Sequence, residues 1–179
     1  ESGYSAHDTL TRRYLEDEDF VARLQDTVAV DGLDAADFDA IVVAGGQAPM
    51  FTFEHEEALQ RLFLDFHAMG RITAALCHGT VLLLHLEREG RPFVEGRRMT
   101  GFANSEEDAA AAAVGQELVP LRIEDAARAR GGEFVAGPAF EPHAVRDGRL
   151  VTGQQQNSGG ATAKLVIEAL AETREETPR

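Results

Sequence analysis

Residues 72–84 read Ile72-Thr73-Ala74-Ala75-Leu76-Cys77-His78-Gly79-Thr80-Val81-Leu82-Leu83-Leu84. An apolar run reaches the only cysteine of the chain, a histidine and a glycine follow, and a second apolar run begins. This pattern predicts a buried strand that turns sharply into a helix, with the thiol at the corner. A nucleophile at such a corner projects from the end of a sheet and lies near the positive end of a helix dipole, which favours a thiolate.

The rest of the chain alternates predicted strands and helices around this corner. Apolar and β-branched runs predict strands over 38–44, 71–76, 98–101 and 133–136, and a hairpin of 143–145 with 149–152 around Asp147-Gly148. Helical spacing predicts helices over 55–69, from Cys77 to about Glu89, from a cap at Ser105, from Pro120, and over 161–170. Such alternation is typical of βαβ units, so we expect an α/β fold with a mainly parallel sheet.

The length of 179 residues suits a single domain over residues 1–179. We expect a core over 37–170, a peripheral helical segment over 1–36 and a frayed tail over 171–179. In the peripheral segment, Asp19 or a neighbour is expected to cap a helix that runs to about Asp26. The acidic run at 16–19 is interpreted as a solvated helix start rather than as a metal site.

Composition excludes several classes of protein. The chain is 44% hydrophobic, but no apolar run is long enough to span a membrane. A net charge of -14 opposes any general affinity for nucleic acid, because phosphates would be repelled. A single cysteine excludes an internal disulfide framework and a CxxC redox pair. We therefore expect a cytoplasmic protein that binds neither nucleic acid nor membranes.

Cys77 and His78 are the first candidates for chemistry. A lone cysteine is often a small buried hydrophobe, but a position at a strand-to-helix corner favours a nucleophile. At a sharp turn the His78 imidazole can fold back toward the thiol, as a general base or as a charge partner for the thiolate. The alternative for His78 is a solvent-facing side chain in the first helical turn. Gly79 would let the following chain pack closely.

Two further features stand near predicted strand ends. The Gly45-Gly46 pair follows the strand at 38–44, and its N–H groups could face a developing oxyanion, although an ordinary turn would look the same. Glu106 and Glu107 follow the strand at 98–101. A carboxylate near His78 would orient the imidazole, but taken alone both glutamates are explained by a helix dipole.

Together these features resemble the ThiJ/PfpI superfamily, which has the class I glutamine amidotransferase-like fold. The most similar branch contains the Hsp31-like chaperones and the glutathione-independent glyoxalases. The segments that carry the resemblance lie in family order at 37–46, 75–79, 99–107 and 149–154. It implies a flavodoxin-like three-layer sandwich, with helices on both faces of a mainly parallel sheet.

The resemblance also implies roles for individual residues. Cys77 would be the nucleophile, His78 its adjacent histidine and Glu107 the acid, with Glu106 as the fallback. The oxyanion site and pocket would include Gly46 and the backbone N–H of His78, with Gly45, Gln47 and Gly79 beside them, and the loop at 154–158 would help to line the pocket. No metal and no organic cofactor is implied, and a homodimer is expected.

Several positions depart from the family pattern. Gln47 stands where the family usually has a histidine, and Thr80 where it has a proline. The loop at 155–158 reads Gln-Gln-Asn-Ser in place of Asn-Pro-Ala-Ser. The family also begins with a strand, a helix and a second strand that carry a glutamate next to the cysteine. We expect this N-terminal unit to be missing from the sequence at hand.

Three functions follow as expectations. The first is a cysteine-dependent enzyme that converts a small 2-oxoaldehyde to a 2-hydroxy acid, as glyoxalase III does. The second is a stress-response chaperone or redox-sensing protein without turnover, in which the thiol is oxidised. The third is a thiol amidohydrolase or peptidase. All three depend on the chemistry of Cys77 or on the branch that the chain resembles.

Overall fold

The computed structural model describes residues 8–176, and the chain divides into two units after Leu33. This division falls just before the boundary expected at residue 36. The first unit holds α1 (Thr9–Leu15), α2 (Glu18–Gln25) and the short 3₁₀ helix η1 (Val30–Gly32). The helix expected to run to about Asp26 is confirmed as α2. Its N-cap is Asp17, whose carboxylate accepts a hydrogen bond from the Phe20 N–H at 3.0 Å.

A four-stranded sheet forms the centre of the second unit, in the order β1-β2-β8-β7. Its strands are β1 (Ala40–Val43), β2 (Ile72–Leu76), β7 (Ala144–Asp147) and β8 (Leu150–Gly153). β1 and β8 both run parallel to β2, whereas β7 runs antiparallel to β8. The predicted α/β class with a mainly parallel sheet is confirmed.

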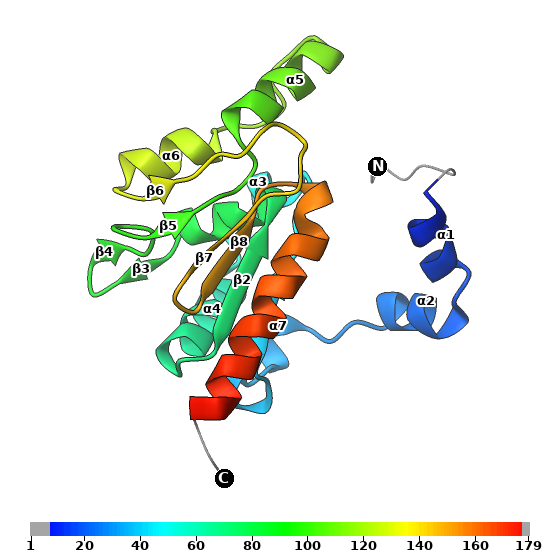
Figure 1. Cartoon of the computed structure of the whole chain (residues 1–179), viewed down its shortest axis with the longest axis vertical. Coiled ribbons are helices and arrows are strands. Elements are labelled where there is room, and N and C mark those ends of the chain that lie inside the picture. The colour runs from blue at the N-terminus through cyan, green and yellow to red at the C-terminus, as the bar shows by residue number, and fades with distance from the viewer. Residues whose placement is uncertain (1–7, 177–179) are drawn as a thin grey trace. The chain divides into compact units, whose positions relative to one another are not determined.

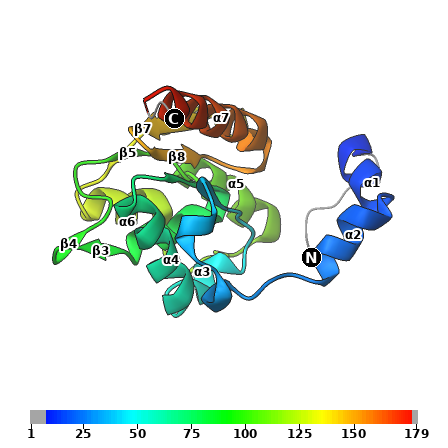
Figure 2. The same cartoon turned by 90° about the horizontal axis from the view of Figure 1, so that it is seen from below.

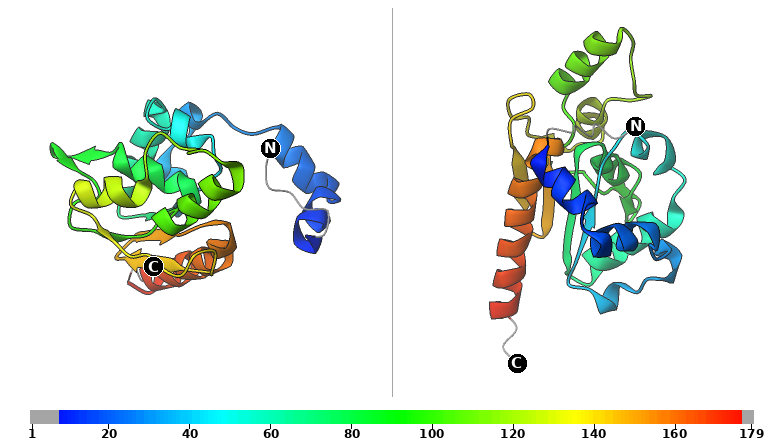
Figure 3. Two further views of the ribbon diagram at one scale, coloured as in Figure 1. Left: turned by 90° about the horizontal axis from the view of Figure 1, so that it is seen from above. Right: turned by 90° about the vertical axis from the view of Figure 1, so that its right-hand side faces the viewer.

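Helices cover both faces of this sheet, as Figures 2 and 3 show. The long helix α7 (Gly159–Glu176) packs on one face, where Ile72, Ala74, Val151, Val166 and Ala169 form a small apolar cluster. On the other face lie α4 (Glu57–Ala68) and the 3₁₀ helix η3 (Cys77–Leu84), which belong to the larger core with Phe63, Val81 and Leu83. The three-layer arrangement expected of a flavodoxin-like fold is therefore present.

Shorter elements complete the second unit (Figure 1). Before the sheet and between its first two strands lie η2 (Ala35–Asp37) and α3 (Pro49–Thr52). β3 (Glu87–Arg88) and β4 (Arg91–Pro92) form a hairpin, and β5 (Arg98–Met99) runs parallel to β6 (Glu133–Phe134). α5 (Asn104–Val114) and α6 (Ile123–Ala129) lie between β5 and β6, and η4 (Gln156–Ser158) leads from β8 into α7. Within residues 8–176, no helix is both long and apolar enough to cross a membrane.

The prediction of a helix from Cys77 to about Glu89 is wrong in type and length. The segment is a 3₁₀ helix that ends at Leu84, and the β3–β4 hairpin follows it. The run Val81-Leu82-Leu83-Leu84 is buried on every side and has no polar face that would mark the period of an α-helix. Glu89 and Gly90 both have positive φ, 55° and 74°, which is the requirement of a tight two-residue hairpin loop.

Other boundaries differ from prediction for local reasons. β1 is not buried on both faces: Val42 is 53% exposed, although Ala40 of the same strand packs against the apolar cluster under α7. The N-cap of α5 is Ala103 rather than Ser105, and the α6 helix begins at Ile123 rather than at Pro120. The β7–β8 loop is Gly148-Arg149, since Asp147 pairs with Leu150.

The closing helix α7 also differs from the prediction of 161–170. It continues to Glu176, so residues 171–176 of the expected frayed tail are helical. The rest of that tail, 177–179, and residues 1–7 of the peripheral segment lie outside the described residues.

Candidate active site

The strand-to-helix corner is a sharp turn with an unusual backbone. Cys77 has a φ of 56°, although it is not a glycine, and it stands between the last residue of β2 and the rest of η3. For an ordinary residue this left-handed conformation costs roughly 1–2 kcal/mol. The predicted corner is confirmed, with the thiol at the residue that carries the strained backbone.

Two glycines allow the corner to pack against the end of β1. A Cβ built on Gly45 would lie 2.7 Å from the Cβ of Cys77, and one on Gly79 would lie 2.6 Å from the Ala44 carbonyl oxygen. Real Cβ atoms do not approach so closely, so both positions require glycine. The predicted close packing at Gly79 is present, and the backbone of Gly45 packs against the side chain of Cys77.

The side chains of Cys77 and His78 face each other across this corner. The Cys77 Sγ lies 3.7 Å from the Nδ1 of His78, so the imidazole folds back toward the thiol. Both side chains are buried, at 9% and 5% exposure, so their interaction is weakly screened by water. His78 is therefore not the solvent-facing residue that the alternative interpretation describes.

Glu107 contacts the other nitrogen of the same ring. Its Oε1 lies 3.0 Å from the His78 Nε2, and the glutamate is only 2% exposed. The three side chains thus form one chain of contacts from thiol to imidazole to carboxylate. Of the two candidate glutamates, Glu107 makes this contact, whereas the carboxylate of Glu106 is bonded to other groups.

The surroundings of His78 alter its acidity. Burial lowers the pKa of the imidazole, but the hydrogen bonds with Cys77 and Glu107 and the negative charges of both outweigh burial. The pKa rises from 6.5 to about 9. The imidazolium is thereby favoured at neutral pH, where it would stabilise a thiolate at Cys77.

Aromatic rings support the face of the imidazole. The Phe102 ring stacks on His78 at a centroid distance of 4.1 Å, and the Phe140 ring meets Phe102 edge-on at 6.5 Å. Neither ring was among the residues predicted to belong to the site. Phe102 lies in the family segment at 99–107 and offered a signal, but nothing local to Phe140 indicated its place.

The other predicted pocket residues are Gly46, Gln47, the N–H of His78 and the loop at 154–158. Gly46 has a φ of 112°, and Gln47 donates its side-chain N–H to the Leu118 carbonyl oxygen at 3.2 Å. The N–H of His78 belongs to the first turn of η3, whose N–H groups have no acceptor inside the helix. Of the loop at 154–158, Gln154 is fully buried and is bonded to Glu106 rather than to Cys77.

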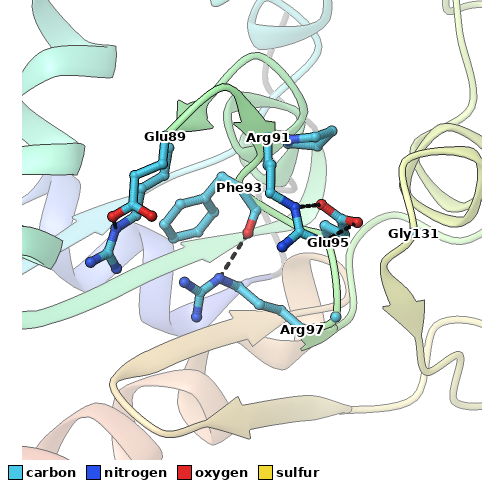
Figure 4. A pocket seen from close by; sticks show the side chains of 9 residues that line it. Glu89, Arg91, Phe93, Glu95, Arg97 and Gly131 are labelled. Carbon is cyan, nitrogen blue, oxygen red and sulfur yellow. Dashed lines mark hydrogen bonds and ion pairs between the residues drawn. The ribbon is translucent and has the colours of Figure 1, made fainter.

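A separate groove of about 680 Å³ lies at the β3–β4 hairpin (Figure 4). Its three arginines are already occupied: Arg91 pairs with Glu95 at 2.7 Å, and Arg88 lies 3.8 Å from Glu89. Arg97 donates to the Phe93 carbonyl oxygen at 2.8 Å and stacks over the Phe93 ring. The groove is not lined by Cys77, His78 or Glu107, so it is distinct from the corner. Within residues 8–176, no three His, Cys, Asp or Glu side chains are arranged to hold a metal ion.

The chain is similar to known proteins over most of its length. The family model described as the DJ-1/PfpI family matches residues 16–169. The chain belongs to the DJ-1/PfpI family. The resemblance to the ThiJ/PfpI superfamily and its Hsp31-like glyoxalase branch is confirmed.

Curated relatives from fungi are similar over most of the chain. The glutathione-independent glyoxalase HSP31 of Saccharomyces cerevisiae is 29% identical over 169 residues, which cover 87% of this chain and 67% of that protein. The glutathione-independent glyoxalase hsp3101 of Schizosaccharomyces pombe is 32% identical over 161 residues, covering 86% and 65% respectively. The chain therefore spans about two thirds of the length of these relatives.

Solved structures share the fold. Glyoxalase III from Candida albicans superposes with a TM-score of 0.76 at 25% identity, covering 90% of this chain and 69% of that one. The Rapid Encystment Protein of 24 kDa from Francisella tularensis gives a TM-score of 0.85 at 23% identity, with coverages of 93% and 73%. The second likeness concerns the fold alone.

Proposed function

We propose that this protein is a glutathione-independent glyoxalase that converts a small 2-oxoaldehyde to a 2-hydroxy acid, with Cys77 as its nucleophile. The observation that carries the proposal is the chain of contacts from the Cys77 thiol through His78 to Glu107, at a backbone corner built for a nucleophile. The names of the fungal relatives support the same reaction.

The first step uses the thiolate. Cys77 Sγ attacks the aldehyde carbon and forms a C–S bond, and the carbonyl oxygen takes a proton to give a hemithioacetal. The imidazolium of His78, favoured by its raised pKa, stabilises the thiolate before attack and can supply this proton. The backbone N–H of His78, which lies in the first turn of η3, is suited to the developing oxyanion.

The later steps move a proton and add water. The neutral imidazole removes the proton from the former aldehyde carbon, and the neighbouring carbon receives a proton in turn, which converts the hemithioacetal to a thioester of a 2-hydroxy acid. Water then hydrolyses the thioester and restores the thiol. The sum is one 2-oxoaldehyde and one water giving one 2-hydroxy acid, so no external oxidant or reductant is consumed. Glu107 keeps the ring oriented throughout.

The proposal is tested by turnover of methylglyoxal without glutathione, in the protein with its natural N-terminus. Lactate should form at a rate that added glutathione does not change. His78→Asn should lower kcat by about 10²-fold or more. The matched control is His85→Asn, because His85 ends the same 3₁₀ helix without contacting Cys77, and it should retain the wild-type rate. A wild-type protein that forms no lactate would overturn the proposal, and cleavage of peptides in its place would favour a thiol hydrolase.

A further inference from the structure

Glu106 is a buried carboxylate that the proposed reaction does not use. It is 0% exposed, and its oxygens accept three hydrogen bonds of 2.9 Å, from the Ala103 N–H, the Phe140 N–H and the Gln154 side-chain amide. No lysine, arginine or histidine among the described residues forms an ion pair with it. A carboxylate buried without a counter-ion is costly, so its three donors must compensate for the lost water.

These bonds join three segments that are distant in sequence. Ala103 precedes α5, Phe140 belongs to the loop at 137–141, and Gln154 follows β8. The Gln154 amide strengthens the junction, since its Oε1 accepts from the Gly137 N–H at 2.7 Å and its Nε2 lies 3.3 Å from the Gly137 carbonyl oxygen. Glu106 and Gln154 together fasten the loop to the start of α5.

The loop holds Phe140 in a strained backbone conformation. Its φ is 60°, which a phenylalanine rarely adopts. Both of its backbone polar groups are bonded to side chains: the N–H to Glu106 at 2.9 Å, and the carbonyl oxygen to the Asn157 side-chain N–H at 2.8 Å. This clamp presents the Phe140 ring to the edge of Phe102, whose face stacks on His78.

Two groups support His78, and both belong to the segment 102–107, which also holds Glu106. Glu107 bonds the Nε2 of the ring, and Phe102 packs against its face. Glu106 acts on Glu107 by capping the Ala103 N–H, because Ala103 begins the turn in which the Glu107 N–H bonds the Ala103 carbonyl oxygen at 3.0 Å. It acts on Phe102 through Phe140.

We propose that Glu106 is a positioning residue for the Cys77 site, which fixes the His78 ring through Glu107 on one side and through Phe140 and Phe102 on the other. The inference rests on the proposed function, in which His78 serves Cys77. A carboxylate suits the position because all three partners are donors. Glutamine would turn an amide N–H toward one of them and leave that donor unpaired.

The test compares Glu106→Gln with Glu124→Gln. Glu124 is the matched control because its carboxylate also accepts from the first turn of α5, at the Asn104 N–H (3.0 Å), while its other oxygen accepts from Arg128 at 2.9 Å. The readouts are kcat for methylglyoxal and the pH dependence of Cys77 alkylation by iodoacetamide. Glu106→Gln should lower kcat roughly 10- to 100-fold and move the midpoint of alkylation to higher pH. Glu124→Gln should change neither.

A purely structural role gives a different result. It would lower the stability of Glu106→Gln and leave both kcat at permissive temperature and the alkylation profile at wild-type values, which would overturn the proposal. If Glu106→Gln does not fold, Phe140→Ala takes its place, since it removes the ring through which Glu106 acts on Phe102. Wild-type kcat and an unmoved alkylation profile in Phe140→Ala would exclude that route.

The double variant Glu106→Gln/Phe140→Ala sharpens the assignment. If Glu106 acts in part through Phe140, the loss in the double variant is smaller than the product of the two single losses. A loss in the double variant equal to the product of the two single losses would show that Glu106 does not act through Phe140. Alkylation does not need turnover, so a shifted profile in a protein that forms no lactate would overturn the proposed reaction and support the positioning role.

Discussion

Cys77 at the corner and Phe140 in the loop at 137–141 both adopt positive φ, 56° and 60°, although neither is a glycine. At the corner, the conformation is imposed by a strand, a 3₁₀ helix and two glycines that let the chain pack closely. In the loop, it is imposed by the side chains of Glu106 and Asn157. The strained conformation is thus maintained by backbone packing at the corner, and by hydrogen bonds from residues distant in sequence in the loop.

This difference decides what could be predicted from sequence. The corner is local: an apolar run, Cys77-His78-Gly79 and a second apolar run stand together, so its position was predictable. The loop depends on residues 34 and 17 positions away, so nothing near Phe140 indicates its conformation. Sequence reasoning without a family resemblance also could not choose between Glu106 and Glu107, because adjacent residues of a helix point in different directions.

The strands were more predictable than the segments between them. β1 and β2 lie where apolar, β-branched runs predicted strands, because strands inside a parallel sheet are made of such residues, and β7 and β8 lie on either side of the turn signal at Asp147-Gly148. The 3₁₀ helix after Cys77 was taken for a longer α-helix, since a run that is buried on every side has no helical period to measure. The cap of α5 was missed because the capping group is the Glu106 carboxylate and not a Ser or Asp side chain.

The largest effect is expected where the corner meets Glu107. Glu107→Gln removes the carboxylate that orients His78 and helps raise its pKa to about 9. We expect kcat/KM for methylglyoxal to fall about 10²-fold or more. Because the imidazolium becomes less stable, the alkaline limb of the pH–rate profile should also move to lower pH. If Glu107→Gln keeps the wild-type kcat/KM and the wild-type alkaline limb, Glu107 is not needed for the reaction.

Backbone packing at the corner predicts the next effect. Gly79→Ala would place a Cβ 2.6 Å from the Ala44 carbonyl oxygen, so the free energy of unfolding should fall by about 1–3 kcal/mol. Gly160→Ala is the control, because its Cβ would meet open space in α7, and alanine there should stabilise by about 0.5–1 kcal/mol. Urea unfolding measures both. Equal stability of Gly79→Ala and wild type would disprove the close contact.

The raised pKa of His78 predicts a pH dependence of stability. Since the folded pKa of about 9 exceeds the unfolded value of 6.5, protonation stabilises the fold fully below pH 6.5, and this stabilisation is lost as pH rises through about 9. We expect a loss of about 1–3 kcal/mol across that window by urea unfolding. Glu107→Gln should lose less over the same range. If the free energy of unfolding falls equally with pH in the two proteins, Glu107 does not contribute to the raised pKa of His78.

The smallest effect tests strain in the loop. Phe140→Ala keeps an unfavourable positive φ, whereas Phe140→Gly relieves it, so the glycine variant should be more stable than the alanine variant by about 1 kcal/mol. Glu141 is the neighbouring control. It is not among the residues with positive φ, and there glycine should be less stable than alanine. If alanine is more stable than glycine at position 140 as well as at 141, the backbone of Phe140 is not strained as that of Cys77 is.

The central claim, that Cys77 is the nucleophile of a glyoxalase, is tested most directly by lactate formation from methylglyoxal in Cys77→Ala. The two proteins are compared without glutathione, at a temperature where both are folded by circular dichroism. We predict steady lactate formation by the wild type and a rate at the buffer background in Cys77→Ala. A variant that forms lactate at the wild-type rate would contradict the account.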